Sequence, residues 1–102
     1  MTYRVITETE AERDWHEAVI WYDKHEPGVG GRVNEALRAV LRTLASQPER
    51  FPRASRLAHK AKVPAPWPYS IYFTINREFS EVKVLAIWHG ARNPAVLRRR
   101  LK

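Results

Sequence analysis

Cysteine is absent from this 102-residue sequence, which excludes disulfide bonds and thiolate metal sites. That absence is typical of a reducing compartment, so we expect a cytoplasmic protein. No apolar run reaches the ~18 residues that a membrane span needs, and the N-terminus lacks a basic segment followed by an apolar one. The length leaves no room for a second hydrophobic core. We therefore expect one soluble domain over residues 1–102, without a leader or a membrane anchor.

Acidic residues are scarce in the second half of the chain. Residues 52–102 contain eleven Lys and Arg but only Glu78 and Glu81 as acids, for a net charge of +9. Residues 1–51 contain seven Lys and Arg and nine Asp and Glu, for a net charge of −2. Such asymmetry favours an acidic or polyanionic partner for the C-terminal half. A surface that only keeps a small basic protein soluble explains it equally well, and the sequence leaves both interpretations open.

The segment from Tyr69 to His89 has the strongest secondary-structure pattern in the chain. Its first limb alternates between apolar and more polar residues, which is typical of a half-buried strand. The apolar face of this limb consists of Tyr69, Ile71, Phe73 and Ile75. Residues 82–88 are apolar on both faces, as in a strand at the centre of a sheet. Simple alternation places Val84 with Ala86 on one face, and Leu85 with Ile87 on the other. The pattern predicts an antiparallel hairpin at the sheet centre.

Two amphipathic helices are predicted before that hairpin. The first begins near residues 7–9, where Thr7-x-x-Glu10 and Thr9-x-x-Glu12 match the capping-box pattern. Its apolar face recurs at helical spacing through Ala11, Trp15, Ala18, Val19 and Tyr22. We expect Pro27-Gly28 and Gly30-Gly31 to stop this helix and form the connection. The second helix is predicted from about Arg32 to Ala45, because Pro48 disfavours helix at the residue before it.

The remaining segments complete the predicted fold. Residues 3–7 alternate as a short first strand, and residues 59–63 form a weak strand that the following prolines confine to a sheet edge. After the hairpin, Asn93-Pro94 indicates a cap and a helix-starting proline, and a short basic tail over residues 95–102 follows. The predicted class is α+β: an N-terminal strand, a helical hairpin, and a three-stranded antiparallel meander forming one small sheet.

Few residues are arranged for catalysis or for cofactor binding. The four histidines lack the spacing of a zinc motif. The glycines at 28, 30 and 31 lack the preceding strand and the lysine–hydroxyl pair of a phosphate-binding loop. We interpret the carboxylates of the first helix as a solvated acidic face. The sequence therefore predicts no metal and no cofactor.

His89 and Arg92 are the pair that best suits chemistry. His89 ends the predicted central strand, and a histidine beside a phosphate-binding arginine suits acid–base cleavage of RNA. Lys60 and Lys62 would add two ammonium groups on one face of the edge strand. Alternatively, His89 and Arg92 form a structural corner, and the lysines only block unwanted strand pairing. No second acid–base group is evident, so the structural interpretation is favoured.

Partner binding is assigned to one aromatic and five cationic side chains. Trp21 lies off the apolar stripe of the first helix, so we expect it to be exposed at a protein interface. The cationic candidates are Arg53, Arg56, Arg98, Arg99 and Arg100. These residue types suit an acidic partner, and Arg53 and Arg56 would join Lys60 and Lys62 in one basic patch, but spacing does not show which of them touch the partner.

A set of short motifs resembles the RelE/ParE toxin superfamily of bacterial type II toxin–antitoxin modules. The motifs are Glu17-Ala18-x-x-Trp21-Tyr22 with Pro27-Gly28-x-Gly30, Ala36-Leu37 with Pro48-Glu49-Arg50-Phe51-Pro52, Pro68-Tyr69-Ser70-Ile71-Tyr72, and Val84-Leu85-Ala86-Ile87-Trp88-His89-x-x-Arg92-x-Pro94. They cover nearly the whole chain in the right order, and the ordered set is more specific than any one motif. The resemblance implies a helical hairpin packed on a small antiparallel sheet, in agreement with the residue pattern.

The resemblance implies one of two targets. The RelE-like branch cuts messenger RNA on the ribosome with a cluster of basic residues, whereas the ParE-like branch inhibits DNA gyrase. This chain ends in Arg98-Arg99-Arg100-Leu101-Lys102, without the Tyr-rich end of the nuclease branch, and its Trp21-Tyr22 segment is more similar to the ParE branch. We therefore expect a non-catalytic gyrase inhibitor. A ribosome-dependent ribonuclease that uses His89, Arg92, Lys60 and Lys62 is the alternative, and an inactive family member that only binds its partner is a third hypothesis.

Either branch implies a cognate antitoxin that forms a hetero-oligomer with this chain. Such partners lay an amphipathic, often acidic segment over the toxin. We expect the groove between the helical hairpin and the sheet, together with the basic second half, to receive that segment.

Overall fold

The computed structural model describes residues 2–101, and its elements follow the predicted order. They are β1 (Arg4–Thr7), α1 (Thr9–His25), α2 (Val29–Ser46), the 3-10 turn η1 (Pro48–Arg50), β2 (His59–Lys62), β3 (Tyr69–Asn76), β4 (Glu81–His89) and α3 (Pro94–Arg100). The predicted α+β class, with a first strand, two helices and then a meander, is confirmed. No helix within the described residues is long and apolar enough to span a membrane.

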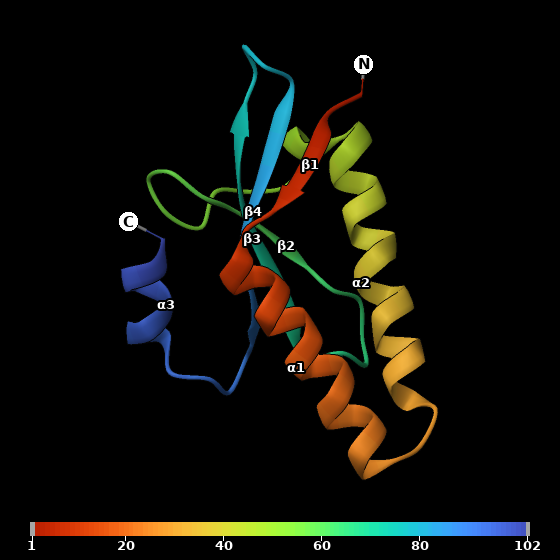
Figure 1. The fold of residues 1–102 in the computed structure, drawn as a ribbon. Helices are drawn as coiled ribbons and strands as arrows, with labels where there is room; N and C mark the ends of the chain where they lie inside the picture. Colours follow the sequence, from red (N-terminus) through yellow and green to blue (C-terminus); the bar gives the residue numbers. More distant parts are fainter. Residues whose placement is uncertain (1, 102) are drawn as a thin grey trace.

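The sheet has the strand order β1-β4-β3-β2, so the β3–β4 hairpin occupies its centre as predicted. β2 pairs antiparallel with β3 and forms one edge, in agreement with the prediction for residues 59–63. β1 pairs parallel with β4 and forms the other edge. The helices α1 and α2 cover one face of the sheet, and α3 packs on the opposite face (Figure 1).

A β-bulge in the central hairpin changes which side chains share a face. Tyr72 is opposite Ala86 and Phe73 is opposite Val84, so Leu85 has no residue opposite it. The extra residue reverses the alternation of β4, because two residues of one strand face one residue of the other. Val84 lies in the core under α1 and α2, whereas Ala86 lies in the core under α3. The prediction that Val84 and Ala86 share a face is therefore wrong.

The larger core lies between the helical hairpin and the sheet. Phe73, Leu37 and Leu44 are its largest fully buried side chains. Burying each such side chain stabilises the fold by about 1.5–3 kcal/mol. The other fully buried members come from both helices, from the three antiparallel strands and from the residue after β2: Ala11, Val33, Ala61, Val63, Ile71, Val82, Val84 and Ile87. These side chains fill the interior between the helical hairpin and the sheet.

The connection between the two helices differs from the prediction. α2 begins at Val29 rather than near Arg32, so Gly30 belongs to the helix and not to the turn. A Cβ atom at Gly30 would lie 2.5 Å from the carbonyl oxygen of Val19, so only glycine lets the helices approach this closely. Asp23 secures the turn, because its Oδ1 accepts hydrogen bonds from the backbone N of Gly28 at 3.2 Å and of Gly30 at 2.8 Å.

The first helix lacks the predicted capping boxes. Thr7 is the last residue of β1, Thr9 is already the first residue of α1, and the N-cap Glu8 makes no side-chain capping bond. Instead, the backbone N of Glu8 donates to the carbonyl oxygen of Val84 at 2.9 Å. The sheet thus fixes the start of α1, because the chain passes from strand to helix without a loop in which a cap would form.

The basic tail predicted after the hairpin forms the ordered helix α3. Its N-terminus has the cap predicted from Asn93-Pro94: the Asn93 side chain accepts a hydrogen bond from the backbone N of Ala95 at 2.9 Å. Leu97 anchors the helix, because it is buried against Tyr72, Ala86 and Trp88 in a second, smaller core. The tail is therefore a packed element of the fold.

Candidate functional site

Asp14 is the one charged residue among residues 2–101 that is buried, with 5% of its surface exposed. It lies three residues after Ala11 and four before Ala18, so helical geometry turns it toward the sheet with those two buried residues. Its Oδ2 accepts a hydrogen bond from the backbone N of Ile87 in β4 at 3.0 Å. A carboxylate buried to this extent also needs positive partners, because an unpaired charge in the interior is costly.

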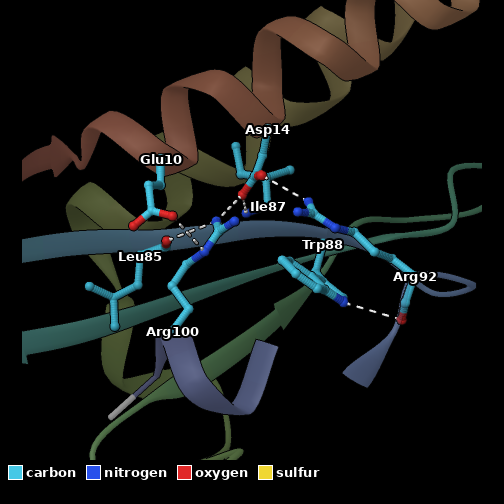
Figure 2. A network of polar contacts seen from close by, with 7 residues as sticks. All are labelled: Glu10, Asp14, Leu85, Ile87, Trp88, Arg92 and Arg100. Carbon is cyan, nitrogen blue, oxygen red and sulfur yellow. Dashed lines mark hydrogen bonds and ion pairs between the residues drawn. The ribbon is translucent and has the colours of Figure 1, made fainter. Parts of the chain in front are cut away.

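Two arginines from the C-terminal end of the chain supply that positive charge. Arg92 lies in the loop after β4, and its Nη1 donates to Asp14 Oδ1 at 3.0 Å. Arg100 is the last residue of α3, and its Nη1 donates to Asp14 Oδ2 (Figure 2). The Arg100 Nε also lies 3.6 Å from Oε2 of Glu10. One carboxylate of α1 therefore holds β4, the following loop and α3 together.

The indole of Trp88 supports both arginines. The guanidinium carbon of Arg92 lies 3.8 Å from the centre of the ring, and that of Arg100 lies 5.0 Å from it. The Trp88 Nε1 donates to the backbone oxygen of Arg92 at 3.4 Å. Each cation–π contact contributes about 0.5–2 kcal/mol, depending on how far the cation is desolvated. Both guanidinium groups thus contact a carboxylate and an aromatic ring, and the side chain of Arg92 stays 41% exposed.

His89 closes the corner that follows β4. Its Nδ1 accepts a hydrogen bond from the backbone N of Ala91 at 2.9 Å, so the neutral ring carries its proton on Nε2. The rings of His89 and Tyr69 form a T-shaped pair, with the two ring centres 5.2 Å apart. This geometry matches the structural role weighed for His89 in the sequence. His89, Trp21 and Tyr69 line a cavity of about 310 Å³ between α1 and the end of β4.

Lys60 and Lys62 lie on the other face of the sheet from His89. In β2, Lys60 is opposite Tyr72 and Lys62 is opposite Ser70, and the Lys60 Nζ lies 5.9 Å from the Tyr72 ring centre on the α3 side. His89 is opposite Tyr69, which belongs to the core under α1 and α2. The sheet therefore separates the two lysines from the histidine with which they would form a catalytic set.

The candidate partner-binding residues fall into separate regions. Arg53, Arg56 and Arg98 line one cavity beside α3. Arg99 lines a different cavity between α1 and α3, and the side chain of Arg100 is only 13% exposed because it reaches inward to Asp14. Trp21 is 53% exposed on α1, as expected, and stacks on His25 with 3.8 Å between ring centres. The structure thus brings three of the six residues together.

Two tyrosines, Tyr69 and Tyr3, have a pKa above the usual value. Burial raises the pKa of Tyr69 to about 12, and the neighbouring Tyr22 adds to the effect. At the far end of the sheet, a hydrogen bond of 3.0 Å to Glu49 raises the pKa of Tyr3 above its usual value. Arg77 in turn holds the pKa of Glu49 below its usual value. Neither phenol supplies a general base, because both favour the protonated form.

Sequence reasoning missed Asp14, the centre of this cluster. The carboxylates of α1 were interpreted as one solvated acidic face, and for Asp14 that interpretation is wrong. The signal that separates Asp14 from the other carboxylates of α1 is its position on the helix: three residues after Ala11 and four before Ala18, it shares the helical face of these two buried residues. No cluster of three His, Cys, Asp or Glu side chains in residues 2–101 is placed to hold a metal ion.

The chain is similar to known toxins in sequence pattern and in fold. Residues 5–94 match the family described as the ParE toxin of the type II toxin–antitoxin system, parDE. No curated protein sequence matches the chain.

Among solved structures, the chromosomal ParDE toxin–antitoxin system of P. aeruginosa is 15% identical with a TM-score of 0.73, over 86% of this chain and 96% of that one. A mutant of the E. coli toxin RelE in the free state is 17% identical with a TM-score of 0.71, over 99% and 95%. The RelBE2 toxin–antitoxin complex of Mycobacterium tuberculosis is 22% identical with a TM-score of 0.64, over 87% and 99%. At these identities the likeness to solved structures establishes the fold alone.

Proposed function

Because the chain belongs to the ParE toxin family of type II toxin–antitoxin systems, we propose that it binds and inhibits DNA gyrase and is neutralised by a cognate antitoxin. In this proposal the chain acts through its surfaces and carries out no chemistry of its own. The family match over residues 5–94 supports a toxin that works with an antitoxin. The choice of gyrase as the target goes beyond what the family match supports.

One observation carries that step: the residues that a ribonuclease would need lie apart. Lys60 and Lys62 are on the α3 face of the sheet, and His89 is on the face covered by α1. The guanidinium of Arg92 is paired with Asp14 through Nη1 and stacked on Trp88, so part of its capacity to bind a phosphate is already used. General acid–base cleavage needs its groups within hydrogen-bond reach of one phosphodiester, and this arrangement does not supply that.

The alternative function is a ribosome-dependent messenger RNA endoribonuclease. Its specific support is the fold, because the solved structures that resemble this chain include RelE toxins as well as a ParDE system. The exposed lysines of β2 would then contact RNA phosphates.

The deciding experiment adds the purified chain to DNA gyrase and to translating ribosomes in parallel. We expect loss of supercoiling and accumulation of cleaved gyrase–DNA complexes, with no cleavage of ribosome-bound messenger RNA. Uninhibited gyrase together with messenger RNA cleavage that His89→Ala abolishes would replace the proposal with its alternative.

A growth assay tests the toxic function itself. Induced expression of the chain alone should arrest growth, with DNA synthesis stopping before translation, and His89→Ala and Lys62→Ala variants should remain toxic. Co-expression of the antitoxin should restore growth. Unimpaired growth during expression of soluble, folded chain would contradict a toxic function.

A further inference from the structure

A second region beside α3 is open and has no partner within the chain. The loop after η1 forms one wall, α3 forms the other, and Tyr72 of β3 lies between them; together they enclose about 910 Å³. We call this cavity the cationic groove. It is lined by Arg53, Ala54, Ser55, Arg56, Leu57, Lys60, Tyr72, Pro94, Leu97, Arg98 and Leu101.

All charged residues that line the cationic groove are positive. They are Arg53, Arg56, Lys60 and Arg98, and none of them takes part in an ion pair within residues 2–101. The cavity on the α1 side of α3 differs, because Glu10, Asp14 and Glu17 accompany its arginines. Four unpaired cations around one cavity create a positive potential that favours a negatively charged occupant.

The rest of the lining is apolar, which bears on the kind of occupant. Leu57 is 62% exposed at the rim, and Leu97 and Leu101 extend the apolar surface from the smaller core to the opening. Single-stranded nucleic acids gain affinity from base stacking on exposed aromatic rings in addition to their contacts with cations. Tyr72 is the only aromatic residue in the lining, and it is 8% exposed with Lys60 near its ring. An occupant with both apolar side chains and carboxylates fits better.

Both walls of the cationic groove are held in place. In the loop, Arg53 Nη1 donates to the backbone oxygen of Arg56 at 2.6 Å. The backbone N of Lys60 donates to the oxygen of Pro52 at 2.9 Å, which joins the loop to β2. On the other side, the Arg100–Asp14 pair and buried Leu97 fix α3. A groove with fixed walls loses little conformational entropy when a partner enters.

We infer that the cationic groove is the docking site for an acidic, amphipathic segment of a partner protein. The inference rests on the proposed function for the identity of that partner, the cognate antitoxin. Apolar side chains of the segment contact Leu57, Leu97 and Leu101, and its carboxylates pair with the arginines of the two walls. The expected receiver thus lies on the α3 face of the sheet, rather than between the helical hairpin and the sheet.

The test measures binding of the full-length antitoxin to the full chain by calorimetry. Arg56→Glu and Arg98→Glu should each weaken binding about tenfold or more, because reversal of a charge replaces attraction by repulsion. Leu57→Asp should weaken it to a similar degree through loss of an apolar anchor. The control Lys24→Glu makes the same change of net charge on exposed α1 and should leave the affinity within about twofold.

Two further measurements separate the outcomes. Circular dichroism and urea unfolding should be unchanged for all four variants, so a loss of binding cannot be attributed to unfolding. A labelled single-stranded RNA oligonucleotide provides the competing ligand: if Arg56→Glu and Arg98→Glu weaken RNA binding and leave antitoxin binding intact, the docking site is overturned. Equal antitoxin affinity for Leu57→Asp, Arg98→Glu and the unmodified chain would also overturn it. Binding is measured independently of toxicity. A chain that fails to arrest growth would contradict the proposed function, whereas the binding test would still give a result.

Discussion

Arginines on the two sides of α3 differ in their surroundings. On the side toward α1, Arg100 is 13% exposed and its charge is neutralised by buried Asp14. On the other side, Arg98 lines the cationic groove and has no acidic partner among the described residues. A helix turns by about 100° per residue, so two positions along the chain are enough to point one arginine inward and the other outward. In our proposal, one side of α3 stabilises the fold and the other side binds a partner.

The largest effect is expected from removal of the shared carboxylate. Asp14→Ala leaves Arg92 and Arg100 without their partner and the backbone N of Ile87 without its acceptor. Breaking a buried ion pair on one side costs about 3–5 kcal/mol, a large fraction of the stability of a small domain. Urea unfolding followed by circular dichroism measures the loss.

Two variants keep that measurement interpretable. Asp14→Asn retains an acceptor for Ile87 and should lose less stability than Asp14→Ala. Glu17→Gln, an exposed change on the same helix, should stay within about 0.5 kcal/mol of the unmodified chain. If Asp14→Ala unfolds at the same urea concentration as Glu17→Gln, the cluster does not hold the fold together.

The next largest effect on the free energy of unfolding is expected within α3, where Arg100 and Arg98 can be compared directly. Arg100→Ala should cost about 2–3 kcal/mol, because it leaves a buried carboxylate with Arg92 as its one remaining cation. Arg98→Ala should change the free energy of unfolding by no more than about 0.5 kcal/mol, as expected at an exposed site. Thermal and urea unfolding of the two variants give the difference directly. Equal losses of stability in the two variants would mean that Arg100 does not stabilise the fold more than Arg98 does.

The sequence predicts much of the fold because local patterns decide it. Alternation located β3, helical spacing located α1 and α2, and Asn93-Pro94 located the start of α3. The face assignment of Val84 and Ala86 failed, because a bulge depends on the pairing of two strands and leaves no mark on one of them.

The candidate site was less accessible to the sequence. Asp14 and Arg100 are far apart in the chain, and their partnership exists only once α3 packs across the sheet from α1. Whether Arg98 has an acidic partner also depends on the fold, and no carboxylate within residues 2–101 forms an ion pair with it. Residue counts gave the basic character of the second half, but only the fold distinguishes a neutralised arginine from a free one.

A moderate loss of stability is expected on removal of Arg92, smaller than that of Arg100→Ala and larger than that of Arg98→Ala. Its side chain is 41% exposed, so solvent screens its ion pair with Asp14, and Arg100 remains to neutralise the carboxylate. Arg92→Ala should therefore cost about 1–2 kcal/mol, from the lost pair and the lost contact with Trp88. A double-mutant cycle with Trp88→Leu, which removes the aromatic ring, separates the two contributions. A loss as large as that of Arg100→Ala would show that exposure does not rank these two pairs.

The smallest effect on stability is expected from Leu57→Asp. This variant should lower antitoxin affinity without a matching loss of stability. Leu57 is 62% exposed in the loop that forms one wall of the cationic groove, so it contributes little to either core. Its replacement should leave the free energy of unfolding within about 0.5 kcal/mol, while antitoxin affinity falls. Arg100→Ala should have the opposite pattern. It should lower the free energy of unfolding, and it should weaken antitoxin binding only to the extent that α3 is displaced from the sheet. Comparison of unfolding and calorimetry for these two variants tests the division directly. If Leu57→Asp destabilises the fold as strongly as Arg100→Ala, the wall of the groove is part of the structural core, and α3 does not separate two functions.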